Sequence, residues 1–91
     1  MSDDKVPMTR EGYDKLVKDL EHLKTTKRRE IADDIAKARA FGDLKENAEY
    51  DAAKNSQAMN EKRIADIEMK LENVQFIDES KIPIYLAILR R

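Results

Sequence analysis

The chain has 91 residues, of which 41% are charged and 41% hydrophobic, and its 18 basic and 19 acidic side chains give a formal net charge of −1. This length fits one small domain, and the absence of Cys and Trp together with a single His excludes disulfides, thiolate metal sites and a His-built catalytic centre. With no basic and apolar leader and no run near the ~20 apolar residues that cross a bilayer, we expect a cytoplasmic, unprocessed protein without a membrane partner.

After an N-terminal arm over residues 1–8, the first predicted element is a long helix that begins near Thr9. The Thr9 hydroxyl can cap the first turn, and Glu11 complements the helix dipole. Apolar residues then recur at steps of three or four, or a multiple, up to Phe41, which predicts one apolar stripe. Its members are Tyr13, Leu16, Leu20, Leu23, Ile31, Ile35 and Ala38. Lys27 interrupts the stripe, and the spacing there predicts local unwinding or a bend near residues 25–30.

Gly42 suits a turn just past the end of this helix, and a second helix follows it. The seam positions of the second helix alternate in steps of three and four, as a and d positions of a coiled coil do. They are Tyr50, Ala53, Gln57, Asn60, Ile64, Ile67, Leu71 and Val74. Facing positions of the two stripes have a nearly constant sum of residue numbers, as an antiparallel arrangement requires. We therefore expect an all-α fold: a long antiparallel two-helix coiled-coil hairpin over residues 9–76, with its tip near residues 42–46, followed by a linker and a short C-terminal apolar tail over residues 77–91.

A hairpin of this kind covers only one stripe of each helix, and its central seam is polar at Lys27, Gln57 and Asn60. Chains of this size rarely gain more than ~3 to 5 kcal/mol from one core. We expect the best apolar layers near the base, formed by Leu16, Leu20, Leu71 and Val74 and joined by Phe76 and Ile77. A chain that is long instead of compact fits two kinds of protein. One uses its length to reach a distant site, and the other is a coiled coil that serves only for oligomerisation.

The predicted tip, residues 43–51, carries four acids and one lysine. One interpretation is a capping box, with Asp43 as the N-cap of the second helix and Glu46 three residues later. The other is a pair of carboxylates one turn apart, which are hard oxygen ligands of the kind that Mg²⁺ accepts. Two carboxylates alone hold Mg²⁺ weakly, so the second interpretation needs another macromolecule to supply the remaining ligands. A capping box would also rigidify the acids that it presents.

The run Ala-Arg-Ala-Phe-Gly-Asp-Leu-Lys-Glu-Asn-Ala-Glu-Tyr over residues 38–50 resembles the N-terminal coiled-coil domain of the bacterial GreA-type transcript cleavage factors. Pro7-Met8-Thr9 and the run over residues 63–68 extend the resemblance to roughly residues 6–79. It implies a DNA-associated transcription elongation factor that is not itself an enzyme. The hairpin would enter the secondary channel of backtracked RNA polymerase, where Asp43 and Glu46 help to hold a second Mg²⁺ and orient a water. The intrinsic activity of the polymerase then cuts the nascent RNA near its 3′ end.

The same resemblance implies no cofactor in the isolated chain, only Mg²⁺ shared with the polymerase. At the tip, Lys45 and Asn47 are candidates for contact with polymerase or nucleic acid, Leu44 for packing against the channel wall, and Tyr50 for stacking on a base. Each also fits an ordinary solvated or seam position, Tyr50 above all because it falls on an a position. A basic cluster on the first helix is either a solvated face or a patch that attracts RNA phosphates. It consists of Lys24, Lys27, Arg28 and Arg29.

The C-terminal tail departs from the resemblance. GreA-type factors continue near residues 77–78 into a second, mostly β domain that docks on the polymerase, whereas the apolar run over residues 82–89 does not resemble that domain. Two further functions therefore stay open beside stimulation of transcript cleavage. One is a regulator that occupies the channel without promoting cleavage, and the other is a structural coiled-coil module that self-associates through the tail.

Overall fold

In a computed structural model of the chain, residues 5–43 and 46–77 are described, and the elements below lie within those two ranges. The element order is β1 (Val6–Met8), α1 (Arg10–His22), a π-helical segment (Leu23–Lys27), α2 (Arg28–Arg39), α3 (Ala48–Glu72) and β2 (Val74–Phe76). The two predicted helices are therefore present, and the first of them is interrupted. The apolar tail over residues 82–89, through which self-association was considered, lies outside the described residues.

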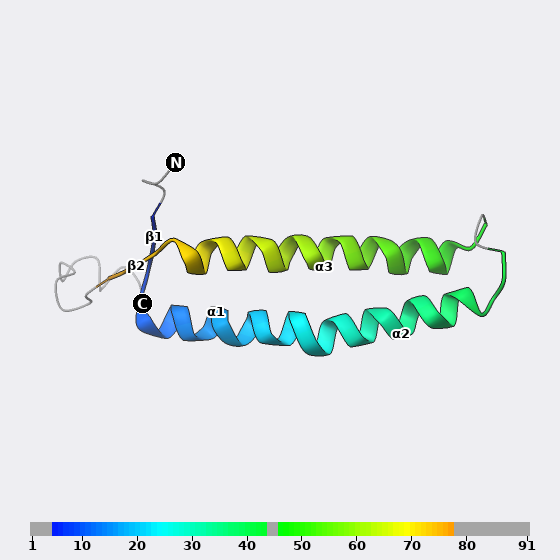
Figure 1. Ribbon diagram of the computed structural model, residues 1–91, viewed down its shortest axis with the longest axis horizontal. Coiled ribbons are helices and arrows are strands. Elements are labelled where there is room, and N and C mark those ends of the chain that lie inside the picture. The colour runs from blue at the N-terminus through cyan, green and yellow to red at the C-terminus, as the bar shows by residue number, and fades with distance from the viewer. Residues whose placement is uncertain (1–4, 44–45, 78–91) are drawn as a thin grey trace, which may run out of the picture.

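The helices form a long, narrow hairpin (Figure 1). One arm consists of α1, the π-helical segment and α2, and α3 runs back beside this arm from the tip to the base. The radius of gyration is 19.1 Å and the principal axes measure 60 × 32 × 20 Å. A compact chain of this length would have a radius of gyration of about 12 Å. The predicted hairpin is thus confirmed, while the supercoil of a coiled coil stays a prediction.

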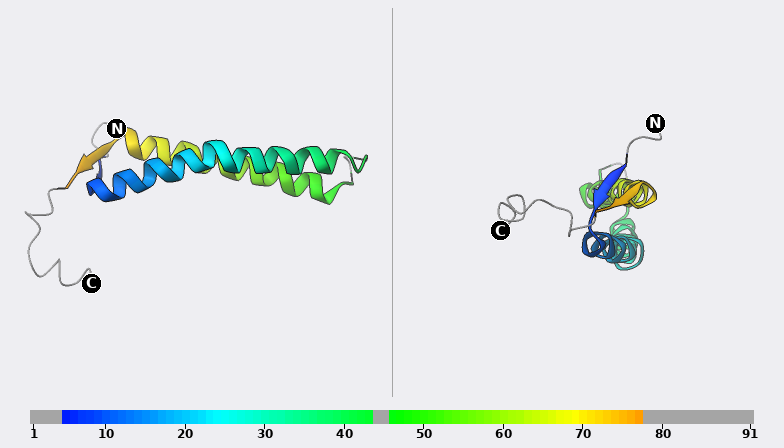
Figure 2. Two further views of the ribbon diagram at one scale, coloured as in Figure 1. Left: turned by 90° about the horizontal axis from the view of Figure 1, so that it is seen from below. Right: turned by 90° about the vertical axis from the view of Figure 1, so that its left-hand side faces the viewer.

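The expected all-α fold class was wrong at the base, where β1 and β2 form a two-stranded parallel sheet (Figure 2). Val6 pairs with Val74, Pro7 with Gln75 and Met8 with Phe76. Strands of three residues are too short to show an alternating pattern, and their pairing joins two ends of the chain that only the hairpin brings together. The sheet thus takes one strand from the predicted arm and one from the predicted second helix.

The start of α1 follows the sequence prediction. Thr9 is the N-cap, and its side-chain oxygen accepts a hydrogen bond of 3.0 Å from the backbone N–H of Gly12. Glu11 lies in the first turn, where a negative charge complements the helix dipole. None of the described helices is long and apolar enough to span a bilayer.

The seam of the hairpin is shielded from solvent where the apolar stripes predict, with Lys27 as the exposed exception. The buried apolar side chains lie at the middle and toward the tip of the shaft, so the expectation that the best-packed layers lie near the base was wrong. They are Leu23, Ile31, Ala38, Ala53 and Ile64. At the base Leu16, Leu20, Leu71 and Val74 are only half-buried, and Phe76 and Ile77 are exposed. The base is less covered because its apolar residues contact one helix and a two-stranded sheet instead of a closed core.

The predicted irregularity in the first helix appears as the π-helical segment, which overlaps the expected range at its start. A buried polar contact accompanies it: the side-chain amide of Asn60, only 4% exposed, donates a hydrogen bond of 3.1 Å to the carbonyl of Leu23. Helix segments of this kind occur where an extra residue must be accommodated in the turn. Among the described residues every buried side-chain nitrogen and oxygen has a hydrogen-bond partner. The polar seam is therefore satisfied rather than strained.

Candidate interaction site at the hairpin tip

The tip begins where α2 ends, and short backbone hydrogen bonds close that end. The N–H of Phe41 donates to the carbonyl of Ala38 over 3.1 Å, and the N–H of Gly42 donates to the carbonyl of Arg39 over 3.1 Å. Gly42 has a φ of 105°, which side-chain-bearing residues rarely adopt. No atom lies within 4 Å of the position a Cβ would take there, so the backbone conformation alone demands glycine. This turn directs the chain outward from the end of α2.

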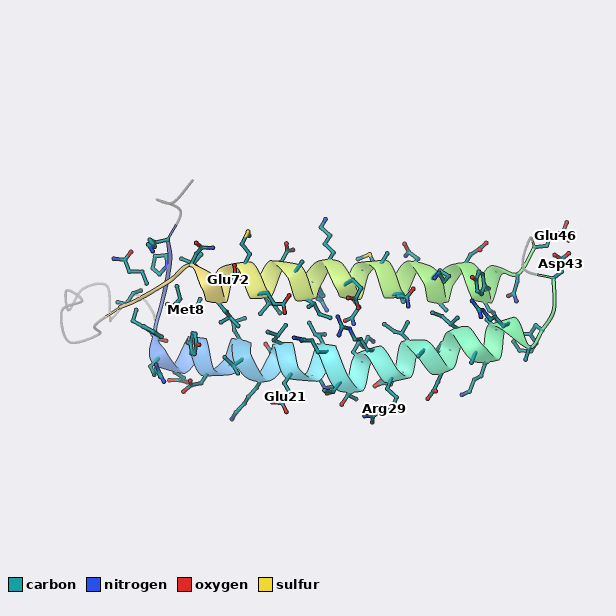
Figure 3. All side chains as sticks on the ribbon, viewed as in Figure 1. Met8, Glu21, Arg29, Asp43, Glu46 and Glu72 are labelled. Atoms are coloured by element: carbon teal, nitrogen blue, oxygen red, sulfur yellow. The ribbon has the colours of Figure 1, made fainter. Side chains whose placement is uncertain are left out.

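Asp43 and Glu46 follow this turn, and both are exposed at the outermost end of the hairpin (Figure 3). A shallow hollow at the tip is lined by Phe41, Asp43, Glu46, Asn47, Ala48 and Glu49. Leu44 and Lys45, candidates for contacts with the channel wall and with the polymerase, lie outside the described residues. The two acids that the sequence singled out are thus brought to one surface, on the apex that the prediction required.

The proposed capping box was wrong. The N-cap of α3 is Asn47, whose side-chain oxygen accepts a hydrogen bond of 3.0 Å from the N–H of Tyr50, and the helix begins at Ala48. Asp43 therefore lies four residues before the cap. The sequence pattern misled because Asp and Asn are almost equally good caps, and the three-residue spacing alone does not choose between them. Asp43 and Glu46 are not needed to begin α3.

Asn47 and Tyr50, two further candidates for contacts at the tip, are both half-buried. The side-chain NH₂ of Asn47 donates a hydrogen bond of 2.6 Å to the carbonyl of Ala38, at the end of α2. Tyr50 lies at a seam position, as the heptad pattern predicts. Both residues are therefore engaged in building the hairpin, whatever else they contact.

The donor set at the tip is incomplete for a metal ion. Carboxylate oxygens are the ligands that Mg²⁺ prefers, and Asp43 and Glu46 offer them. Within residues 5–43 and 46–77, no group of three or more Asp, Glu or His side chains is arranged to hold a metal ion. The tip acids fit the role of partial ligands that require further oxygens from another macromolecule.

The predicted basic cluster divides into two pairs. Arg28 forms a bidentate ion pair with Glu61 of α3, with distances of 2.9 Å from Nε and 2.7 Å from Nη2, and Lys24 lies 3.3 Å from Glu68. For Lys27 and Arg29, both exposed, no ion pair is found among the described residues. Figure 3 shows Arg29 on the face of α2 away from α3. All four cations are exposed, and two of them, Lys24 and Arg28, form ion pairs that bridge the helices.

The Arg28–Glu61 pair also perturbs the titration of both groups. The hydrogen bond from Arg28 is the main cause that lowers the pKa of Glu61. The same hydrogen bond raises the pKa of Arg28, with further contributions from the charges of Glu61 and Glu68. Both groups are exposed, so the charges are well screened by solvent and salt. The pair fixes the relative position of the helices more than it adds stability.

Phe41 is a candidate that the sequence interpretation missed. It was taken as the end of the apolar stripe, yet 69% of its surface is exposed and it lines the same hollow as the two acids. Its position directly before the helix-ending Gly42 was the available signal. Phe41 also lines a second hollow between the arms, together with Ala52 and Ala53 of α3. The tip therefore carries an exposed aromatic side chain beside the two carboxylates.

Comparison with known proteins shows which family and which proteins the chain is similar to. Residues 6–76 match the GreA/GreB family described as "Transcription elongation factor, N-terminal". Transcription elongation factor GreA of Thermoanaerobacter pseudethanolicus is 57% identical over 77 residues, which are 85% of this chain and 49% of that protein. The GreA protein of Clostridium kluyveri is 51% identical over 80 residues, which are 88% of this chain and 50% of that protein. The chain spans about half the length of these curated relatives.

Proposed function

The chain belongs to the GreA/GreB family of transcription elongation factors, whose N-terminal region it matches, and from this premise we propose that it stimulates cleavage of backtracked nascent RNA by RNA polymerase. The observation that carries the proposal is the pair of exposed carboxylates, Asp43 and Glu46, at the end of a narrow shaft. The chain acts as an accessory factor in the cytoplasm. The hydrolytic activity belongs to the polymerase.

The dimensions of the hairpin support insertion into a channel. The helix α3 has 25 residues, which at ~1.5 Å per residue corresponds to about 37 Å of rigid helix. Viewed along the long axis, the two arms lie side by side and the sheet crosses the base (Figure 2). A shaft of two helices is the narrowest helical structure that can shield an apolar seam. It suits delivery of a small acidic group into the secondary channel.

The chemistry supports a role for the tip acids as borrowed ligands. When bound between the tip and the polymerase, Mg²⁺ supplies a means to activate water and to stabilise charge on the scissile phosphate. Asp43 and Glu46 contribute anionic oxygens and orient the attacking water. The N-cap of α3 is Asn47, so the start of that helix does not depend on either carboxylate serving as its cap.

The exposed cations of the shaft support contact with the extruded RNA. All four members of the basic cluster are exposed, but Lys24 and Arg28 are paired with carboxylates of α3, so we expect Lys27 and Arg29 to attract phosphates more strongly. Attraction of this kind weakens with salt and does not depend on RNA sequence. The shaft therefore contributes affinity for the RNA, while the tip contributes the carboxylates that take part in cleavage.

The direct test adds the chain to backtracked transcription complexes and resolves the RNA on a gel. We expect RNA shortened from its 3′ end with the parent chain. Asp43→Ala and Glu46→Ala should abolish the shortening while helical content by circular dichroism stays within about 5%, because neither residue caps a helix and even a lost cap costs only ~1 kcal/mol. The matched control is Asp33→Ala, which removes an exposed acid of α2. This variant should stimulate shortening of the RNA as the parent chain does.

Two results would contradict the proposal. Unchanged RNA despite binding of the parent chain to polymerase would favour a regulator that occupies the channel without promoting cleavage. Shortening by both tip variants at the parental rate would remove the acids from the mechanism. A competition assay with a labelled parent chain separates loss of binding from loss of activity.

A further inference from the structure

The side chain of Asn47 connects the two helices at the tip. Its Oδ1 accepts a hydrogen bond of 3.0 Å from the N–H of Tyr50, in the first turn of α3. Its Nδ2 donates a hydrogen bond of 2.6 Å to the carbonyl of Ala38, in the last turn of α2. The two partners fix the orientation of the amide, because an N–H requires an acceptor and a carbonyl requires a donor. One short side chain thus binds both ends of the tip loop.

The bond to Ala38 lies in a protected place. Ala38 is 2% exposed and Asn47 is half-buried, so water competes poorly for the carbonyl. The same carbonyl accepts the N–H of Phe41 over 3.1 Å, where the chain leaves α2. The chain therefore leaves α2 and returns toward α3 at the same backbone group. The residues between these two points include Asp43 and Glu46.

We propose that Asn47 is a positioning residue that holds the start of α3 against the end of α2 and so presents Asp43 and Glu46 in one fixed arrangement. The proposal rests on the function proposed above and names how its site is held together. Asn is suited to this role because it combines an acceptor and a donor on one short side chain. Asp retains an acceptor for the cap but has no donor when ionised. Ser retains an acceptor for the cap, but its donor is on the same single oxygen, one bond nearer the backbone, so it does not span the two partners as the amide does.

This role predicts a kinetic signature different from that of a contact residue. Loss of a contact with polymerase or RNA weakens binding and raises the concentration of factor that gives half-maximal cleavage. Loss of positioning leaves binding through the shaft intact and lowers the maximal rate, because misplacing a reacting group by about 1 Å can cost up to ~100-fold. Whether the substitution changes the half-maximal concentration or the maximal cleavage rate therefore identifies the role of Asn47.

The first experiment measures both constants with Asn47→Ser and Asn47→Asp, and uses Asn55→Ser as the matched control at an exposed position of α3. Both Asn47 variants should lower the maximal cleavage rate about ten-fold and change the half-maximal concentration less than about two-fold. The control should behave like the parent chain. An unchanged maximal rate, or a higher half-maximal concentration at the parental maximal rate, would overturn the proposal.

The second experiment reads the loop without any cleavage. The chain contains no Cys, so nitroxide labels attached at Glu46→Cys and Lys62→Cys report one defined distance between the tip and the shaft. The distribution of that distance should be narrow in the labelled parent and with Asn55→Ser, and broad with Asn47→Ser and Asn47→Asp. Circular dichroism verifies that α3 still forms. Equal widths in all four proteins would overturn the proposal.

The two experiments separate the two proposals. If the parent chain shortens no RNA but the distribution broadens with the Asn47 variants, the proposed cleavage function fails and the holding role of Asn47 stands. If the parent chain shortens RNA and the variants change neither the rate nor the width, the cleavage function stands and the role of Asn47 fails.

Discussion

The shaft and the tip of this hairpin are held by different kinds of interaction. Along the shaft, apolar side chains such as Leu23 and Ile64 are buried between the helices, and Arg28 bridges to Glu61. At the tip, a glycine with positive φ turns the chain and Asn47 bonds to both helices. Many apolar residues can fill a seam, but few residues can replace either tip feature. We therefore expect the shaft to tolerate exchange of one apolar residue for another, and the tip to tolerate few substitutions at Gly42 and Asn47.

The largest effect on stability is expected from emptying the seam. Ile64 is 4% exposed, and Ile64→Ala should cost about 2–3 kcal/mol, the lower part of the usual range because a narrow hairpin can partly collapse around the gap. That is about two fifths or more of the ~3 to 5 kcal/mol expected for the whole chain. Urea unfolding, monitored by circular dichroism, measures this loss of stability. Met69→Ala, at a largely exposed position of α3, is the control, and an equal loss in both variants would contradict the buried seam.

A smaller effect is expected from the backbone of the tip. Gly42 has a φ of 105°, so Gly42→Ala forces a side-chain-bearing residue into an unfavourable conformation at a cost of about 1–2 kcal/mol. The melting temperature should fall by roughly 5–10 °C. Gly12→Ala is the comparison: Gly12 has no positive φ, and its added Cβ would lie 3.3 Å from Thr9 Oγ1, a contact that a small shift relieves, so its melting temperature should fall less. If the two variants melt together, the turn at Gly42 does not require glycine.

The smallest effect is expected from the ion pair that bridges the shaft. The folded-state pKa of Glu61 is lowered by Arg28, so the pair contributes stability above the unfolded value of about 4.3 and loses it as the pH falls through the lowered folded value. The melting temperatures of the parent and Glu61→Gln should therefore differ at pH 7 and converge as the pH falls below the lowered pKa of Glu61. Glu21→Gln, which removes an exposed carboxylate from α1, is the control. A difference that stays constant with pH would contradict the assignment.

The hairpin was predictable because its pattern is long. The apolar steps of both stripes repeat over many turns, so single exceptions such as Lys27 do not hide them, and the start at Thr9 follows local capping chemistry. The altered spacing at Lys27, Ile31 and Ile35 predicted local unwinding or a bend, and the structure has the π-helical segment there. The parallel strands at the base could not be predicted, because each has three residues and their pairing depends on the hairpin between them.

The candidate site was predicted in part. The sequence identified Asp43 and Glu46 as an exposed pair, but it assigned the cap of α3 to Asp43 instead of Asn47. It also grouped four cations that the fold divides, since only the facing residues of α3 decide that Lys24 and Arg28 find carboxylates. The cap was ambiguous because Asp and Asn cap almost equally well, whereas the carboxylates that pair with the cations lie far away in the sequence, where a local pattern contains no information about them.

The sequence by itself determined that two helices fold back around one apolar stripe with an acidic apex, because helical periodicity and glycine conformation act over a few neighbouring residues. Only the tertiary structure decided which side chain begins α3, which cations are neutralised and how the two ends of the described chain pair. Each of these depends on hydrogen bonds or charges across the two arms, whose register is fixed once the whole seam is packed.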